Sequence, residues 1–123
     1  MKKKQFNISI RPRRLRENKI LRNLVSENVI TKNDLIYPLF VRSGKNIKTE
    51  ISSMPGIYHF SPDTILLEIE TLLNLGLNKI ILFGIPDKKD PLGTDAFSKD
   101  GIIQKTIKKI KSKFPEIFII SDI

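Results

Sequence analysis

Strand-like and helix-like segments alternate along most of the chain, and this alternation restricts the possible folds more than any other feature. Apolar runs at 34–41, 79–83 and 117–121 are typical of strands that are buried on both faces. Between them, residues 62–75 and a segment that ends at Phe114-Pro115 carry apolar residues at helical spacing. The order strand, helix, strand, helix, strand predicts right-handed crossovers and a parallel sheet, which is an α/β fold.

Local signals mark the ends of these helices. Ser61 suits the N-cap of the first helix, and Gly76 suits the left-handed residue that follows its last turn. Asp100 is expected to cap the second helix in the same way. The stretch 42–60 is predicted to be a loop, because Met54-Pro55-Gly56 is a strong turn signal.

Basic residues are concentrated in an N-terminal arm, which we place at residues 1–33. The formal net charge is +9, and residues 1–22 contain nine Lys and Arg against one Glu, a net charge of +8. Such an arm could bind nucleic acid by neutralising phosphates, or it could be a solvated or subunit-docking tail. Leu15 to Val25 is predicted to form a short basic helix that needs a docking surface, since a short helix is marginal alone.

The composition excludes several classes of protein. There is no Cys, so these residues hold no disulfide, thiolate metal ligand or Cys nucleophile. The longest apolar run, 80–85, is far too short to span a bilayer, and no apolar stretch follows the basic start as it would in a signal peptide. We therefore expect a soluble, cytoplasmic protein with no membrane partner.

Candidate site residues lie in the loops that follow the strands, where α/β proteins bind their ligands. These loops begin at 41–44, 83–86 and 122–123. The polar segment 87–99 could hold a ligand, but an ordinary solvated connection is the better interpretation. His59 has no acidic or Cys partner at metal-ligand spacing and is interpreted as a surface or packing residue. The lysines are expected to be solvated, so none is a candidate for a desolvated Schiff-base lysine.

Several short motifs occur in the order and at the spacing of one family. They are Arg11-Pro12-Arg13-Arg14-Leu15-Arg16, the run from Asp34 to Val41, Met54-Pro55-Gly56-Ile57-Tyr58, Leu82-Phe83-Gly84-Ile85-Pro86, Gly93-Thr94-Asp95-Ala96-Phe97, Asp100-Gly101-Ile102-Ile103-Gln104, Phe114-Pro115-Glu116 and Ser121-Asp122-Ile123. Together they resemble the porphobilinogen synthase family, also called delta-aminolevulinic acid dehydratase. The resemblance extends from Arg11 to the last residue.

The resemblance implies a (β/α)₈ barrel, with an N-terminal arm that embraces a neighbouring subunit in a homo-octamer. Enzymes of the family condense two molecules of 5-aminolevulinate to porphobilinogen, with loss of two waters, in haem and tetrapyrrole biosynthesis. Two lysines on later strands bind the substrates as Schiff bases, and zinc or magnesium assists in many members. Residues 34–123 would then be the first three strands of the barrel with their helices. A subunit-docking arm also becomes a better explanation of the basic residues than nucleic-acid binding.

The resemblance also assigns roles to individual residues. Asp122 matches the active-site aspartate at the end of the third strand, which helps with proton transfers. Phe83 matches a phenylalanine that lines the substrate pocket, and Arg16 lies near an allosteric magnesium region in some members. Both Schiff-base lysines, and the cysteines of zinc-dependent members, would come after Ile123.

The chain alone is therefore expected to be inactive and, as an incomplete barrel with an open edge, prone to aggregate. If the sequence is a partial record, the chain is interpreted as the first part of an enzyme. If it is a true truncation, the chain is interpreted as a gene remnant. A non-enzymatic basic protein that binds nucleic acid through its arm is the remaining alternative.

Overall fold

The chain divides into two units, Met1–Ile30 and Thr31–Ile123. The computed structural model describes residues 12–86, 91–94 and 98–122. In the first unit a 3-10 turn, η1 (Arg14–Arg16), precedes a short helix, α1 (Lys19–Leu24). The side chain of Asn18 caps this helix, because it accepts a hydrogen bond of 2.8 Å from the Leu21 amide. The predicted arm helix therefore forms in part.

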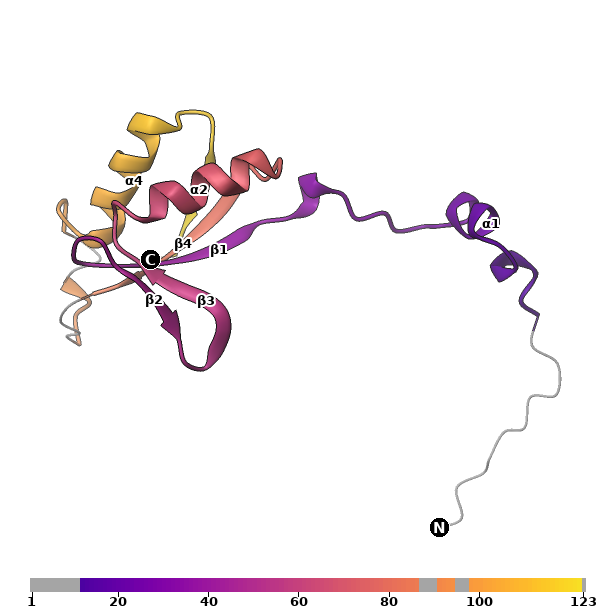
Figure 1. The fold of residues 1–123 in the computed structure, drawn as a ribbon, viewed down its shortest axis with the longest axis horizontal. Helices are drawn as coiled ribbons and strands as arrows, with labels where there is room; N and C mark the ends of the chain where they lie inside the picture. The colour runs from indigo at the N-terminus through magenta and orange to yellow at the C-terminus, as the bar shows by residue number, and fades with distance from the viewer. Residues whose placement is uncertain (1–11, 87–90, 95–97, 123) are drawn as a thin grey trace, which may run out of the picture. The chain divides into compact units, whose positions relative to one another are not determined.

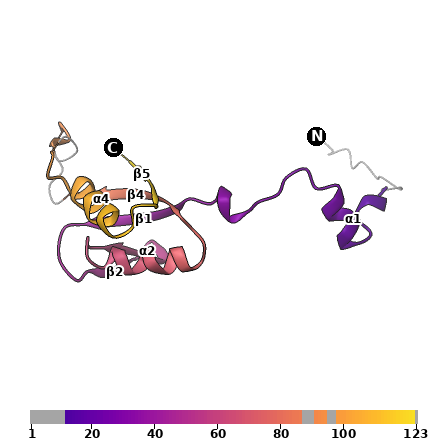
Figure 2. The same ribbon diagram turned by 90° about the horizontal axis from the view of Figure 1, so that it is seen from above.

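The second unit is built on a five-stranded sheet with the strand order β2-β3-β1-β4-β5 (Figure 1). The strands are β1 (Tyr37–Arg42), β2 (Lys48–Ile51), β3 (Met54–Phe60), β4 (Lys79–Ile85) and β5 (Phe118–Ser121). β3, β1, β4 and β5 pair in parallel, whereas β2 is antiparallel to β3. The predicted parallel strands are thus confirmed as β1, β4 and β5, the last of which lies at the sheet edge in Figure 2.

The prediction of three strands with a loop at 42–60 was wrong, because this stretch forms the β2–β3 hairpin. The chain turns at Ser52 and Ser53, and Met54-Pro55-Gly56 lies within β3. The sequence signal misleads because Pro and Gly are depleted from strand interiors, while the partner strand Lys48–Ile51 is mostly polar. The first strand also starts later than predicted, at Tyr37, because Lys32–Asp34 forms a 3-10 turn, η2.

Two helices, α2 (Ile65–Asn74) and α4 (Ile102–Lys113), cover one face of the sheet. The buried residues of the helices and the strands form a single core. Its members are Leu39, Val41, Phe60, Ile65, Ile69, Leu72, Ile80, Leu82, Ile102, Ile110 and Ile117. An ion pair of 3.0 Å between Lys113 and Glu70 joins the two helices at the surface. No helix in the described part of the chain has both the length and the hydrophobicity needed to cross a bilayer.

The helix ends follow the predicted signals only in part. Gly76 has φ +80°, and the amides of Gly76 and Leu77 donate to Leu73 and Leu72, so α2 ends in a Schellman motif as its glycine indicates. Asp100 does not cap α4, whose N-cap is Gly101. Nor does Ser61 cap α2, because its hydroxyl group is hydrogen-bonded instead to the loop before β2.

Gly84 allows α4 to approach β4 closely. A Cβ atom at this position would lie 2.6 Å from Cγ1 of Ile103 and 3.1 Å from Cγ2 of Ile102. A side chain at this position would therefore require the Ile102 and Ile103 side chains to shift, near the end of β4 where the candidate site begins.

Candidate functional site

Three aromatic side chains form a row on the face of the sheet that the helices leave uncovered. Phe40 on β1 is in register with Phe83 on β4 and with His59 on β3. Their neighbours Leu39 and Leu82 are buried against the helices, so the alternation of side chains along a strand turns this row to the opposite face. The Phe40 and Phe83 rings stack at 5.3 Å, and the His59 ring meets Phe40 edge-on at 6.2 Å.

Asp122 extends this row at the end of β5. Ser121 is in register with Leu82, and the Asp122 amide donates to the Leu82 carbonyl oxygen at 3.1 Å. This hydrogen bond continues the parallel ladder, so Asp122 lies opposite Phe83, and its side chain is exposed. The structure thus places opposite each other the two residues, Phe83 and Asp122, to which the family resemblance assigns active-site roles, at the carboxyl ends of parallel strands where α/β proteins bind ligands.

The chemistry of the row suits a small organic molecule with both apolar and charged parts. The stacked rings of Phe40 and Phe83 give an apolar surface that is half-buried. Asp122 adds a carboxylate at one end of this surface, where it can accept and return protons. His59 closes the other end with an imidazole group.

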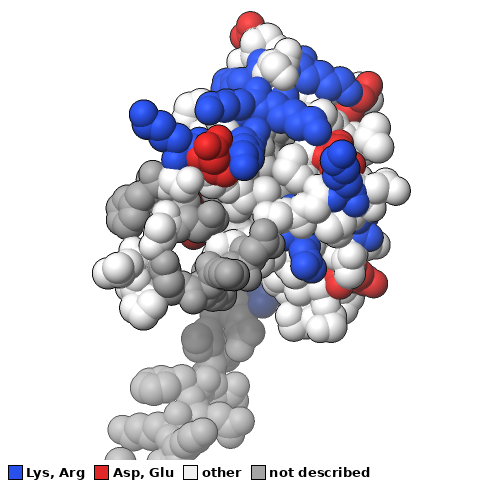
Figure 3. Space-filling view, turned by 90° about the vertical axis from the view of Figure 1, so that its left-hand side faces the viewer, with Lys and Arg blue, Asp and Glu red and all other residues white. Residues whose placement is uncertain are grey.

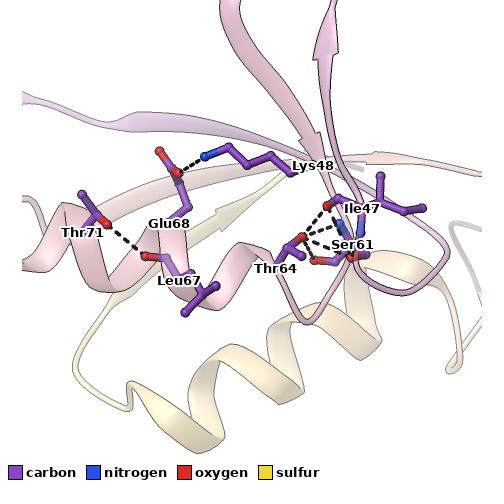
Figure 4. Close-up of polar contacts among 7 residues, drawn as sticks. All are labelled: Ile47, Lys48, Ser61, Thr64, Leu67, Glu68 and Thr71. Atoms are coloured by element: carbon purple, nitrogen blue, oxygen red, sulfur yellow. Dashed lines mark hydrogen bonds and ion pairs between the residues drawn. The ribbon is translucent and has the colours of Figure 1, made fainter.

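The loop after β1 is held in place by the start of α2, as Figure 4 shows. The Ile47 amide donates to Oγ of Ser61 at 2.9 Å, the Ser61 amide donates to the Ile47 carbonyl oxygen at 3.1 Å, and the Thr64 hydroxyl group also donates to that oxygen. Ser61 is fully buried. Asp63 accepts a hydrogen bond of 2.8 Å from the Asn46 amide, and the Ser61 side chain and this amide lower the pKa of Asp63. The loop that borders the row is therefore firmly anchored.

We expect Gly44→Ala to destabilise the chain more than Gly56→Ala. Both glycines have positive φ, +134° and +81°, which an alanine adopts only with strain of about 1–3 kcal/mol. At Gly44 a Cβ atom would also overlap the Ile47 side chain, whereas no atom lies within 4 Å of a Cβ atom at Gly56. Urea unfolding of the two variants, followed by circular dichroism, measures the difference. Equal losses would show that the Ile47 side chain moves aside at no cost.

The lysines of the described residues are all exposed or half-buried, as the sequence indicated. Lys105, Lys108 and Lys109 lie on the solvent side of α4, and Figure 3 shows Lys and Arg side chains gathered on the upper part of that view. Lys79 begins β4 and so lies at the end of the strand remote from the row. The described residues therefore offer no desolvated lysine for Schiff-base chemistry.

Two of the predicted features lie elsewhere. The polar loop 87–99 and the Gly93-Thr94-Asp95-Ala96-Phe97 motif fall partly outside the described residues, which omit 87–90 and 95–97. Arg16 ends η1 in the first unit, where its carbonyl oxygen accepts a hydrogen bond of 3.0 Å from Nη1 of Arg22. Its side chain is exposed, and its predicted role near an allosteric magnesium region stays a prediction.

The described residues provide no donor set that fits a metal centre. Residues 12–86, 91–94 and 98–122 contain no group of three or more His, Cys, Asp or Glu side chains that could hold an ion. The chain also has no Cys to supply thiolate ligands. We therefore assign no step of the chemistry to a metal held by these residues.

Sequence reasoning missed two residues of the row, Phe40 and His59. Treating 42–60 as a loop gave its residues no strand alternation, so His59 could not be placed on a face. The sequence signal that would have placed His59 on a face is the period-two pattern of aromatic residues, Tyr58 and Phe60, on either side of it. In the structure the rings of Tyr58 and Phe60 pack with the core, and their centroids lie 6.2 Å apart.

The fold and the row together define the class of this chain. It is an α/β protein with a mostly parallel sheet, helices on one face, and a candidate ligand site on the other face at the carboxyl ends of the parallel strands. Comparison with known proteins identifies the family. A family model described as delta-aminolevulinic acid dehydratase matches residues 9–123, so the chain belongs to the delta-aminolevulinic acid dehydratase family.

Individual relatives agree with this assignment. Over 113 residues the chain is 47% identical to a delta-aminolevulinic acid dehydratase of Ruminiclostridium josui, covering 92% of this chain and 55% of the relative. It is 47% identical to the Synechocystis sp. protein of the same name, covering 93% of this chain and 35% of the relative. A crystal structure of the Toxoplasma gondii enzyme, in complex with the reaction product porphobilinogen, superposes with a TM-score of 0.84 at 33% identity, covering 94% of this chain and 33% of that chain. The chain thus spans between a third and about half of the length of these relatives.

Proposed function

We propose that this chain supplies the amino-terminal part of a porphobilinogen synthase, which condenses two molecules of 5-aminolevulinate to porphobilinogen with release of two waters. The observation that carries the proposal is the row Phe40, Phe83 and Asp122 at the carboxyl ends of β1, β4 and β5, in a chain that belongs to this family. The Toxoplasma gondii relative, whose structure holds porphobilinogen, supports the choice of reaction.

The roles of the residues follow from their chemistry. Asp122 accepts and returns protons while bonds form between the two substrates and water leaves. Phe83, backed by the stacked ring of Phe40, forms an apolar wall against the carbon chain of a substrate. The two Schiff-base lysines that the family resemblance implies come from later strands, because no buried lysine occurs among the described residues. The zinc or magnesium that the family resemblance implies is proposed to bind residues other than the described ones.

The first unit is proposed to serve assembly. Its apolar side chains Leu15, Ile20 and Leu24 have exposed fractions of 58%, 82% and 79%. A short helix with so much apolar surface gains stability by packing against another surface. We propose that the arm packs on a neighbouring copy in a homo-octamer in the cytoplasm, with Arg16 close to an allosteric magnesium region.

A hybrid enzyme tests the proposed function. Residues 9–123 of this chain replace the matching segment of the Synechocystis relative, which keeps its own remaining residues. We expect the hybrid to form porphobilinogen from 5-aminolevulinate, and the chain alone to form none. A hybrid that folds and assembles as its parent does, yet forms no porphobilinogen, would contradict the proposal. Product formation by the chain alone would contradict the assignment of the lysines to later strands.

A further inference from the structure

We propose that Ser61 and Thr64 are positioning residues for the aromatic row. Their hydroxyl groups fix the register of β3 against β1, and this register holds His59 against Phe40. Neither Ser61 nor Thr64 belongs to the row, and both act through the main chain of Ile47, which directly precedes β2. The inference rests on the proposed function for the activity that the row supports.

The pairing between β3 and β1 is short. It consists of two register pairs, Phe40 with His59 and Val41 with Phe60, whereas all six residues of β1 are in register with β4. The rest of β3 pairs with β2, and the residues of that hairpin are mostly exposed. A hairpin alone is marginally stable in water, so the position of β3 depends on what else holds its end.

The main chain of Ile47 binds the end of β3 through both of its polar groups (Figure 4). The Ile47 amide donates to Oγ of Ser61 at 2.9 Å. The Ile47 carbonyl oxygen accepts hydrogen bonds from the Ser61 amide at 3.1 Å and from the Thr64 hydroxyl group. Since Ser61 directly follows Phe60, these bonds continue the pairing of β2 with β3 one step past the pair Lys48 and Phe60. We call Ile47, Ser61 and Thr64 the latch.

The latch is expected to hold β3 more firmly than the nearby ion pair does. Ser61 is fully buried and Ile47 is half-buried, and a buried polar group that loses its partner costs more free energy than an exposed one. Lys48 and Glu68 also join the hairpin to α2 at 3.3 Å, but both side chains are partly exposed, so water and salt weaken their attraction.

The latch acts on the row through His59. This residue lies two positions before Ser61, at the end of β3 that the latch holds. Its ring meets Phe40 edge-on at 6.2 Å, and Phe40 in turn stacks on Phe83 at 5.3 Å. The Phe40 ring thus has an aromatic neighbour on either side. If the end of β3 moves, Phe40 loses one of these neighbours, and the apolar wall that it forms with Phe83 loses support.

The imidazole group of His59 reports on this contact directly. His59 is the single histidine of the chain, so its ring signals in an NMR spectrum are identified without ambiguity. Phe40→Leu removes the neighbouring ring and gives the His59 shifts that mark a lost contact. Ser61→Ala and Thr64→Val each remove one latch hydroxyl group, and both are expected to shift the His59 signals towards those of Phe40→Leu. Thr64→Ser keeps the hydroxyl group and is expected to leave the signals in place.

The matched control is Thr106→Val. It removes a second fully buried hydroxyl group, which donates to the Ile102 carbonyl oxygen at 2.7 Å within α4. The control is expected to leave the His59 signals unchanged. In the hybrid enzyme, Ser61→Ala and Thr64→Val are expected to lower kcat/KM for 5-aminolevulinate about 10- to 100-fold, the effect of misplacing part of a site by about 1 Å. Thr64→Ser and Thr106→Val are expected to stay within about threefold of the unchanged hybrid.

Three results would overturn the inference. They are unchanged His59 signals in both Ser61→Ala and Thr64→Val, an equal shift in Thr106→Val, and a shift of the signals without a loss of kcat/KM. If Ser61→Ala does not fold, Thr64→Val decides, because it removes one hydroxyl group with little change in shape. The NMR measurement needs no turnover. An unchanged hybrid that is inactive would therefore contradict the proposed function, while the His59 signals still decide whether the latch holds the row.

Discussion

Replacing Asp122 by Asn in the hybrid enzyme is expected to lower kcat for porphobilinogen formation about 10²- to 10⁴-fold, the usual contribution of a positioned proton-transfer group. Asn has nearly the same shape as Asp but cannot accept and return a proton. Asp122 lies opposite Phe83 through the hydrogen bond of its amide to Leu82, so the substitution should leave the backbone and the apolar wall in place. KM is therefore expected to change much less than kcat, and steady-state assays of porphobilinogen separate the two quantities.

Two further variants make this result specific to the row. Asp122→Glu keeps a carboxylate and is expected to retain more activity than Asp122→Asn. Asp100→Asn removes an exposed carboxylate from the turn before α4 and is expected to keep kcat close to that of the unchanged hybrid. A kcat for Asp122→Asn within a factor of about three of the unchanged hybrid would reject a proton-transfer role for this residue.

Leu72→Ala is expected to destabilise the second unit by about 2–5 kcal/mol, because it removes a side chain from the core and leaves a cavity between α2 and the sheet. Leu72 is 3% exposed and belongs to the single core formed by the strands and both helices. The loss would be a large fraction of the total stability of a small unit. Urea unfolding of the chain, followed by circular dichroism, gives the change in the free energy of unfolding.

The control lies on the same helix. Leu67 is 66% exposed, so Leu67→Ala makes the same chemical change with little loss of buried surface and is expected to cost no more than about 0.5 kcal/mol. Similar losses for the two variants would mean that helix α2 does not pack on the sheet as described.

The parallel strands β1, β4 and β5 and the helices α2 and α4 were predictable because their signals are local. Strands buried on both faces are continuous apolar runs, as in Ile80 to Phe83, and helices with one buried face repeat apolar residues at helical spacing. Gly76 marked the end of α2 correctly, since a left-handed residue at that position favours glycine whatever the rest of the fold does. Family motifs also made Phe83 and Asp122 candidate site residues, and the strand register places them opposite each other.

The β2–β3 hairpin could not be read from the sequence in the same way. Its strands carry polar residues and a Pro-Gly pair, and their stability comes from pairing with β1 and from contacts such as Lys48 with Glu68. The predicted N-cap at Ser61 failed for a related reason. The Ser61 hydroxyl group had two possible partners, the start of α2 and the loop at Ile47, and the folded chain uses the loop.

The sequence by itself therefore determined the class of fold and the succession of β1, α2, β4, α4 and β5, because periodicity is a property of neighbouring residues. Its motifs made Phe83 and Asp122 candidate site residues. Only the tertiary structure decided that His59, Phe40, Phe83 and Asp122 form one row. That arrangement depends on the register between strands distant in sequence, and a shift of one residue would turn each of these side chains to the opposite face of the sheet.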